Sequence, residues 1–192
     1  MKDVGIIVAA TTNGGIGYKN ALPWSIPEEL KLFRKITTCV ENDKKYNCII
    51  MGKNTWYSIP NKPLKNRINI IITSNEYKKM KNEVDNNDNI IVVKDLQEAI
   101  NHLNRTDSIE NGFIIGGSQL YNECLKKNLD KIKYVYLSII FDKNYKCDKF
   151  IETKIIYDNF IINKEDVITT DKYISMKGIN KRYPVIYDEP PD

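Results

Sequence analysis

The sequence predicts a single-domain α/β fold with a mostly parallel central sheet of about eight strands, an antiparallel C-terminal edge and flanking helices. Three observations support this prediction. The chain has 192 residues, of which 42% are hydrophobic, and this is enough for one buried core. Several short runs of consecutive apolar, β-branched residues are typical of strands that are buried on both faces, as in parallel sheets. Segments with a helical spacing of apolar residues lie between these runs.

The first half of the chain is expected to supply three buried strands and two helices. The opening run over residues 4–10 is continuously apolar, and the loop after it, over 11–24, is rich in Gly and Asn. A helix is expected over 27–37, with Pro27 in its first turn. The remaining elements are strands over 47–51 and 68–73, separated by a short helix that begins near Thr55.

The second half continues this alternation and ends in antiparallel strands. Residues 76–89 are polar and are expected at the surface. Strands are expected over 90–93, 112–115 and 134–141, and helices over 96–103 and 118–127. Two further segments, over 160–162 and 183–187, are expected to pair in antiparallel orientation. Because no linker interrupts the chain, we predict one domain over 1–188, followed by a tail over 189–192.

Scarce residue types exclude several classes of function. The single histidine, His102, excludes a two-histidine metal site, and no metal is predicted. The four cysteines form no C-x-x-C pair and are expected to be free thiols in a reducing compartment. No apolar run approaches the about 20 residues of a membrane span, so we expect a cytoplasmic protein with no membrane partner. A net charge of +4, with Lys and Glu interspersed, gives no indication of a nucleic-acid partner.

The helix expected over 27–37 carries a carboxylate on its apolar face. Ser25 and Glu28 fit a capping box, which gives Glu28 a structural role. Glu29 lies three residues after Ile26 and four before Phe33, within the apolar stripe. Such a carboxylate either loses water, which raises its pKa toward the range of acid–base catalysis, or reaches solvent from the rim. The apolar stripe consists of Ile26, Leu30, Phe33 and Thr37.

Residues suited to phosphate binding follow several of the predicted strands. They are Gly116-Gly117-Ser118-Gln119, Gly52-Lys53-Asn54-Thr55, Thr73-Ser74-Asn75 and Lys94. Glycines at the start of a helix let a phosphate approach free N–H groups, although a tight turn explains the Gly-Gly pair equally well. Ligands of open α/β sheets bind outside the carboxyl ends of the strands. Together, these segments therefore predict a nucleotide with several phosphate groups.

Two further side chains are candidates for ligand binding. Arg67, one of only four arginines, precedes a buried strand, and its guanidinium suits bidentate binding of a carboxylate. An exposed charge at the end of a strand is the alternative. Trp24 precedes the helix that bears Glu29. Its indole N–H could orient a ligand or a water near that carboxylate, and the alternative is that the ring only packs against the start of the helix.

Short motifs follow one another in a specific order along nearly the whole chain. They are Ile7-Val8-Ala9-Ala10, Asn13-Gly14-Gly15-Ile16-Gly17, Leu22-Pro23-Trp24, Glu29-Leu30-Lys31-Leu32-Phe33, Ile50-Met51-Gly52-Lys53-Asn54-Thr55-Trp56, Ser58-Ile59-Pro60, Pro63-Leu64-Lys65-Asn66-Arg67, Phe113-Ile114-Ile115-Gly116-Gly117-Ser118 and Tyr121. In this order and spacing they resemble the dihydrofolate reductase family. The resemblance implies NADPH-dependent reduction of 7,8-dihydrofolate to 5,6,7,8-tetrahydrofolate, with a hydride delivered to C6 and a proton to N5. The product would supply one-carbon metabolism and thymidylate synthesis.

Other functions remain open beside this one. A reductase-like domain that only binds folate or nucleotide, or that scaffolds another enzyme, is one alternative, and a reductase of another pterin-like or pyrimidine substrate is a second. The resemblance also implies a monomer with a small-molecule substrate, and an association with, or fusion to, thymidylate synthase in some relatives.

The resemblance assigns roles around the substrate. Glu29 matches the family's pocket carboxylate, which binds the pterin and promotes its protonation. Trp24 would hold an ordered water, and Ser138 would bond the carboxylate where the family usually has threonine. Arg67 would bind the α-carboxylate of the glutamate tail. The other residues implied at the substrate are Ile7, Val8, Leu30, Phe33, Ile59, Leu64, Ile115 and Tyr121.

The resemblance likewise implies a cofactor site beside a mobile lid over residues 14–22. Gly116 to Leu120 would cradle the pyrophosphate, and Lys53 and Lys94 would be the cations near the 2′-phosphate. Many relatives carry an arginine within the segment that matches Thr73-Ser74-Asn75, and this chain has none. The implied cofactor residues are Ala9, Ile16, Gly17, Asn20, Leu22, Gly52, Lys53, Thr55, Thr73, Ser74, Asn75, Lys94, Gly116, Gly117, Ser118, Gln119 and Leu120.

Overall fold

A nine-stranded sheet forms the centre of the computed structural model, which describes residues 1–84, 87–141 and 144–183. In spatial order its strands are β10 (Ile168–Thr169), β11 (Tyr173–Asn180), β7 (Tyr134–Ile140), β1 (Val4–Thr11), β6 (Ile109–Gly116), β3 (Tyr46–Gly52), β4 (Arg67–Ile72) and β5 (Ile90–Val93), and β9 (Phe160–Ile162) pairs with β11. The strands from β7 to β5 are parallel, and β11 is antiparallel to β7, β9 and β10. The predicted fold class is confirmed.

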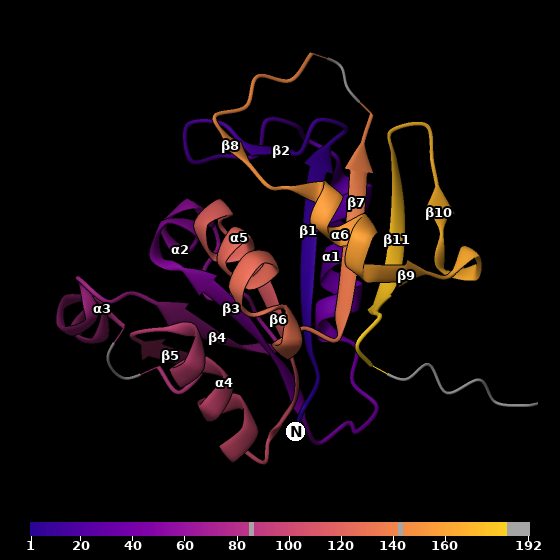
Figure 1. The fold of residues 1–192 in the computed structure, drawn as a ribbon. Helices are drawn as coiled ribbons and strands as arrows, with labels where there is room; N and C mark the ends of the chain where they lie inside the picture. The colour runs from indigo at the N-terminus through magenta and orange to yellow at the C-terminus, as the bar shows by residue number, and fades with distance from the viewer. Residues whose placement is uncertain (85–86, 142–143, 184–192) are drawn as a thin grey trace, which may run out of the picture.

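Helices cover both faces of the sheet (Figure 1). Buried side chains of α4 (Leu96–Arg105), α5 (Ser118–Lys127) and α6 (Thr153–Asn159) belong to the largest hydrophobic cluster, on one face. Side chains of α1 (Pro27–Thr38), α2 (Lys53–Ser58) and α3 (Tyr77–Glu83) pack into a second cluster on the other face. The described residues also form two short 3-10 helices, η1 (Leu129–Lys131) and η2 (Lys164–Asp166). Among the described residues, no helix has the length and apolarity that a membrane span requires.

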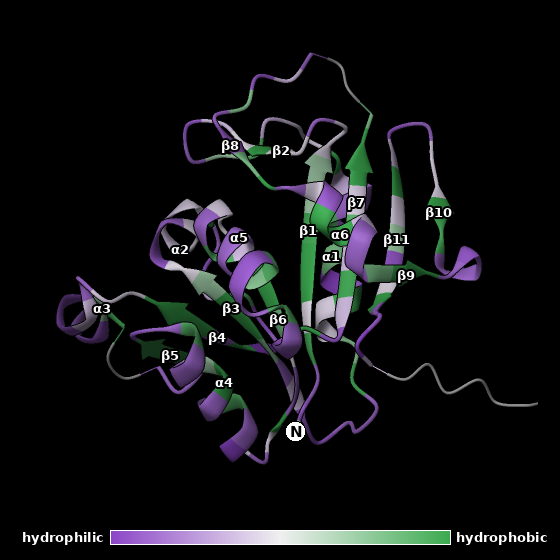
Figure 2. Ribbon diagram, viewed as in Figure 1, coloured by the Kyte–Doolittle hydropathy of each residue, from purple (hydrophilic) through white to green (hydrophobic). Residues whose placement is uncertain are grey.

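The continuous apolar runs form strands because both of their faces are buried. In β3, Cys48 and Ile50 pack into the cluster with α4 and α5, whereas Ile49 and Met51 pack into the cluster with α1 and α2. Successive side chains of a strand point to opposite faces, so both sets must be apolar when helices cover both sides. Figure 2 shows this as hydrophobic strands between helices whose outer faces are hydrophilic.

The segment over 11–24, expected to be a loop, contains a short strand. β2 (Gly15–Gly17) pairs with β8 (Lys149–Phe150) in a separate two-stranded sheet beside the carboxyl end of β1 (Figure 1). Gly14 has a φ of 83°, and a Cβ atom on it would lie 2.4 Å from the carbonyl oxygen of Ile151. This close approach requires glycine and brings the segment against residues more than 130 positions later.

Two other expectations for secondary structure are wrong or incomplete. The polar segment over 76–89 contains α3, whose Met80 is fully buried. β9 pairs in antiparallel orientation with β11, a strand that was not expected because it alternates apolar residues with Ser175 and Lys177 and lacks a continuous apolar run. Tyr183 lies beyond β11, and residues 184–187, like the predicted domain end at 188 and the tail over 189–192, lie outside the described residues.

The predicted capping box at the start of α1 is also wrong. The N-cap is Ile26, with Pro27 as the first helical residue, and no side chain caps the helix. Ser25 is exposed and lies outside the helix, so the predicted spacing is one residue out of register. Glu28 pairs instead with Lys172, whose Nζ lies 3.1 Å from its Oε1.

All four cysteines are free thiols, as expected from their spacing. Cys48 and Cys124 are buried in the core, and burial raises the pKa of each thiol to about 12. Such thiols are inert, because the thiolate is the reactive form.

Candidate active site

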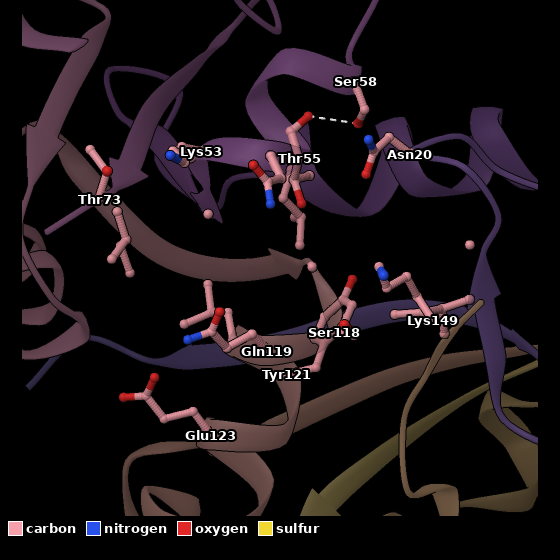
Figure 3. A pocket seen from close by; sticks show the side chains of 18 of the residues that line it. Asn20, Lys53, Thr55, Ser58, Thr73, Ser118, Gln119, Tyr121, Glu123 and Lys149 are labelled. Atoms are coloured by element: carbon pink, nitrogen blue, oxygen red, sulfur yellow. Dashed lines mark hydrogen bonds between the residues drawn. The ribbon is translucent and has the colours of Figure 1, made fainter. Parts of the chain in front are cut away.

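A cleft of about 770 Å³ lies at the carboxyl ends of the parallel strands (Figure 3). The structure brings together here every predicted cofactor residue except Gly116. These residues are Ala9, Ile16, Gly17, Asn20, Leu22, Gly52, Lys53, Thr55, Thr73, Ser74, Asn75, Lys94, Gly117, Ser118, Gln119 and Leu120. They converge because the loops after β1, β3, β4, β5 and β6 all emerge at the same edge of the sheet. Val8, Ile115 and Tyr121, predicted at the substrate, also line the cleft.

A tight turn of two glycines, Gly116 and Gly117, borders the cleft through Gly117. Gly116 has a φ of 110°, and a Cβ atom on it would lie 2.8 Å from the Tyr121 ring. Gly117 precedes α5, and a Cβ atom on it would lie 3.2 Å from the Thr55 hydroxyl. Because no side chain covers Gly117, a ligand in the cleft can approach the backbone N–H groups at the start of α5 closely. The Gly-Gly pair is thus a tight turn whose second residue, Gly117, also lines the cleft.

The two lysines predicted near phosphate lie in different electrostatic settings. Lys53 forms an ion pair with Glu76, which precedes α3. Lys94 has its ammonium 5.4 Å from the centre of the Tyr77 ring. Glu76 was not predicted from sequence, because its proximity to Lys53 depends on the pairing of β3 with β4.

Eight residues that line the cleft were not among the predicted site residues, although Asn54 belongs to a motif suited to phosphate binding and Ala21 to the expected lid. They are Ala21, Asn54, Ser58, Ile72, Asp95, Leu96, Glu123 and Lys149. Most of them neighbour a predicted residue in sequence, so a wider window at each strand end would have found them. Lys149 is different, because it enters from β8 through the long-range pairing with β2. In Figure 3 it lies toward the end of the cleft opposite Lys53 and Thr73.

Glu29 is buried on the inner side of α1. It is 7% exposed, so the alternative of a rim residue that reaches solvent is wrong. Burial raises the pKa of the Glu29 carboxyl, and hydrogen bonding to Ser138 acts in the opposite direction. The Ser138 hydroxyl in turn lies 3.3 Å from the hydroxyl of Ser175, a neighbour that sequence analysis missed. Burial raises the pKa of Tyr121, and the nearby Glu29 charge adds to the effect.

Trp24 packs close to this group, at the carboxyl end of β1. Its ring belongs to a buried cluster with Ile26, Ile140 and Tyr173, against which Ala9 packs. The buried indole N–H has no hydrogen-bond acceptor among the described residues. Buried donors in proteins are almost always bonded, so this N–H is suited to a ligand or water. Trp24 therefore combines the two alternatives, because its ring packs at the start of α1 and its N–H can still donate to a ligand or water.

The predicted substrate wall is an apolar cluster beneath α1 and α2. Ile7, Phe33, Ile59, Leu64 and Ile115 pack together with the buried side chains of that face. The Tyr121 hydroxyl donates to the Ile7 carbonyl at 2.7 Å and so joins this wall to the cleft.

Leu30, assigned to the same wall, is not a member of this cluster and is 50% exposed. The buried face of α1 therefore carries Glu29 and Thr37 but not Leu30, which corrects the stripe expected from spacing.

Arg67 is a buried cation on the strand that follows α2, at the start of β4. It is 5% exposed, so the alternative of an exposed charge is wrong. Its Nη1 donates to the Thr37 hydroxyl at 2.7 Å and its Nε to the Lys65 carbonyl at 3.1 Å, while the guanidinium lies 5.9 Å from the centre of the Phe33 ring. Among the described residues no carboxylate pairs with it. A buried guanidinium with donors to spare is suited to binding a carboxylate.

Comparison with known proteins points to one family. Residues 3–181 match the family model described as dihydrofolate reductase. A dihydrofolate reductase from Aedes albopictus is 33% identical over 200 residues, covering all of both chains, and one from Pneumocystis carinii is 36% identical over 165 residues, covering 80% of this chain and 75% of that protein. A bifunctional dihydrofolate reductase-thymidylate synthase from Paramecium tetraurelia is 36% identical over 182 residues, covering 95% of this chain and 34% of that protein.

Proposed function

The chain belongs to the dihydrofolate reductase family and is an oxidoreductase, and we propose that it reduces 7,8-dihydrofolate to 5,6,7,8-tetrahydrofolate with NADPH as its cofactor. The observation that carries this proposal is the buried Glu29 carboxyl beside Ser138 and near Tyr121, a residue of the cleft wall. A reaction that adds a hydride and a proton needs a reductant and a proton source side by side. The cleft suits the first requirement and Glu29 the second.

The residues of the cleft suit a dinucleotide cofactor. Its 770 Å³ falls within the range of small-molecule sites, about 300–1,000 Å³. Gly117 lines the cleft directly before α5, and the free N–H groups in the first turn of that helix suit a pyrophosphate. Lys53, Lys94 and Lys149 supply positive charge along the same cleft. When bound, NADPH supplies the hydride that reaches C6 of the pterin.

Glu29 serves the proton side of the reaction. Because burial raises the pKa of its carboxyl, Glu29 holds a proton at a higher pH than an exposed glutamate does. The same carboxyl can bind the amino and N3 groups of a pterin. Ser138 keeps it oriented, and the free indole N–H of Trp24 can hold the water that carries a proton toward N5. Trp24 and Ser138 therefore act with Glu29, and Glu29 is the group that binds and protonates.

Arg67 and the apolar cluster serve the other end of the substrate. The unpaired guanidinium suits the α-carboxylate of a glutamate tail. Between Arg67 and Glu29 lies Phe33, one helical turn from Glu29 on α1 and in contact with the guanidinium. The apolar wall of Ile7, Phe33, Ile59, Leu64 and Ile115 would thus cover the pterin and its aromatic tail, with Val8 and Tyr121 at the edge of the cleft. A carboxylate-bearing folate fits this wall better than a tail-less pterin or pyrimidine.

We also propose a monomeric, cytoplasmic enzyme whose domain spans 1–188. The bifunctional relatives of Paramecium tetraurelia, Arabidopsis thaliana and Daucus carota support a further proposal, association with or fusion to thymidylate synthase. Light scattering of the purified chain measures its oligomeric state, and a dimeric mass would overturn the monomer.

The test of function is oxidation of NADPH by the purified protein with and without dihydrofolate. We expect the protein to oxidise NADPH only when dihydrofolate is present. The Glu29→Gln variant should stay folded and lose at least about tenfold in kcat at neutral pH. The matched control is Glu28→Gln, since Glu28 is the exposed neighbour that pairs with Lys172. Tight folate binding without NADPH oxidation would favour the binding-only module instead, and full activity of Glu29→Gln would refute the role of the carboxyl.

A further inference from the structure

An ion pair at the edge of the cleft, between Lys53 of the cleft lining and Glu76 outside it, bears on the choice between NADPH and NADH. Lys53 begins α2, directly after β3, and Glu76 stands directly before α3, after β4. The two side chains are in contact and about one-third exposed, at 30% and 34%. The contact lowers the pKa of the Glu76 carboxyl. Glu76 also lies 3.8 Å from Lys79, one turn further along the chain.

The position of this pair follows from the order of the strands. Glu29, Ser138 and Trp24 lie near β1 and β7, and this is the end of the cleft where the proton is supplied. Lys53, Thr73 and Lys94 follow β3, β4 and β5, which continue the sheet in the other direction. A dinucleotide with its nicotinamide at the first end must place its adenosine at the second. NADPH and NADH differ only in the phosphate on the 2′-oxygen of that adenosine.

The cations at this end are not equally available. The Lys94 ammonium faces the Tyr77 ring and has no carboxylate partner among the described ion pairs. Asp95 beside it is occupied as the N-cap of α4, where its Oδ1 accepts from the Glu98 N–H at 2.8 Å. Lys53, in contrast, already has a carboxylate in contact. A phosphate that reaches Lys53 must displace Glu76 or share the lysine with a second negative charge.

We propose that Glu76 is a specificity-determining residue, which holds Lys53 and thereby lowers the preference of this enzyme for a 2′-phosphorylated cofactor. The inference rests on the proposed function, which places the nicotinamide of the cofactor near Glu29 and its adenosine near Lys53. Exposed ion pairs are weak, so Glu76 weakens the contact between Lys53 and a phosphate without abolishing it. Removal of the carboxylate should strengthen binding of the 2′-phosphate by roughly threefold to tenfold and leave the rest of the cofactor site unchanged.

The experiment compares two adenosine ligands that differ only in the 2′-phosphate. Binding of adenosine 2′,5′-bisphosphate and of 5′-AMP is measured by calorimetry for the wild type, Glu76→Gln and Glu83→Gln. Glu83 is the matched control because it is the last residue of α3 and lies at the same 3.8 Å from Lys79, whereas the carboxylate that pairs with Lys53 is Glu76. Glu76→Gln should tighten the bisphosphate roughly threefold to tenfold and change 5′-AMP by less than about twofold, and Glu83→Gln should change neither.

A second pair of variants tests the route through Lys53. Lys53→Met should weaken the bisphosphate, and adding Glu76→Gln to it should then change binding by less than about twofold. Equal tightening of both ligands by Glu76→Gln, no tightening, or an undiminished effect in the Lys53→Met background would overturn the proposal. Folding of the variants is expected, because Glu76 caps α3 through its backbone and makes no side-chain cap bond.

These ligands also separate this inference from the proposed function. Their binding needs neither dihydrofolate nor turnover, so a chain that shows the expected binding changes but does not oxidise NADPH fails the proposed function and keeps the inference. A chain that oxidises NADPH with dihydrofolate but shows no selective effect of Glu76→Gln keeps the function and loses the inference.

Discussion

Replacement of Arg67 by leucine is expected to lower kcat/KM for dihydrofolate by roughly a hundredfold while the protein stays folded. Arg67 is the buried cation beside Phe33, and its only described bonds go to the Thr37 hydroxyl and the Lys65 carbonyl. Of the five N–H donors of a guanidinium, three therefore remain for a carboxylate. Leucine removes all of them and keeps an apolar side chain against Phe33.

The magnitude follows from the kind of contact that is lost. A hydrogen bond to a charged group contributes about 1.5–3 kcal/mol, and a bidentate pair in a buried setting lies at the upper end. A loss of about 3 kcal/mol corresponds to roughly a hundredfold in binding. The fold should survive, because no carboxylate of the described residues pairs with the buried Arg67 and its removal relieves a desolvation penalty.

The assay compares two substrates, dihydrofolate and a dihydropterin that lacks the glutamate tail. Arg67→Leu should lose its roughly hundredfold only with dihydrofolate, and should change the tail-less substrate by less than about threefold. Arg34→Leu is the control, since Arg34 is an exposed arginine close enough for its charge to lower the pKa of Arg67. An equal loss with both substrates would refute the assignment of Arg67 to the tail, as would an unchanged kcat/KM for dihydrofolate.

Two further predictions concern stability. The pKa of the Glu29 carboxyl is raised in the folded state from its ordinary 4.5, so the protonated carboxyl stabilises the fold below pH 4.5, and this contribution is lost as the pH rises through the folded pKa. Glu29→Gln should therefore have a higher Tm than the wild type at neutral pH and the same Tm below pH 4.5. A gain in Tm that does not depend on pH would contradict this prediction. Gly116→Ala should lower Tm by roughly 4–8 °C, because alanine at a φ of 110° is strained by about 2 kcal/mol before its Cβ atom meets the Tyr121 ring at 2.8 Å. Gly52→Ala is the control, because Gly52 has a φ of −74° and a Cβ atom on it would lie 3.9 Å from the nearest atom, so its Tm should stay within about 2 °C of the wild type. An equal loss of Tm in both variants would show that the backbone conformation of Gly116 does not cause the loss.

The sequence predicts most of the parallel sheet because its signals are local. The run over 47–51 is apolar at every position except Asn47, and the helix expected over 118–127 has the same bounds as α5. Both depend on neighbours within a few residues. The same holds for the strand ends at Gly52, Thr73, Lys94 and Gly117, which line one cleft because parallel strands end at one edge.

Long-range pairing accounts for what the sequence does not predict. β2 and β8 lie more than 130 residues apart and have only three and two residues, so neither has a strand pattern of its own before the two pair. Lys149 enters the cleft through that pairing. β11 is a strand because β7 and β9 supply partners on both of its sides, although half of its sequence is polar or glycine.

By itself, the sequence determines the fold class, the cleft at the carboxyl edge and the identity of the groups that bear the chemistry, since these depend on residue type and local order. Only the tertiary structure decides their state. Glu29 and Arg67 could each have been solvated, and it is the packing of α1 against the sheet that removes both from water. Lys53 could have been a free cation, and it is the pairing of β3 with β4 that brings Glu76 to it. Burial and charge pairing depend on distances between atoms that lie far apart in the chain, so they arise only when the chain folds.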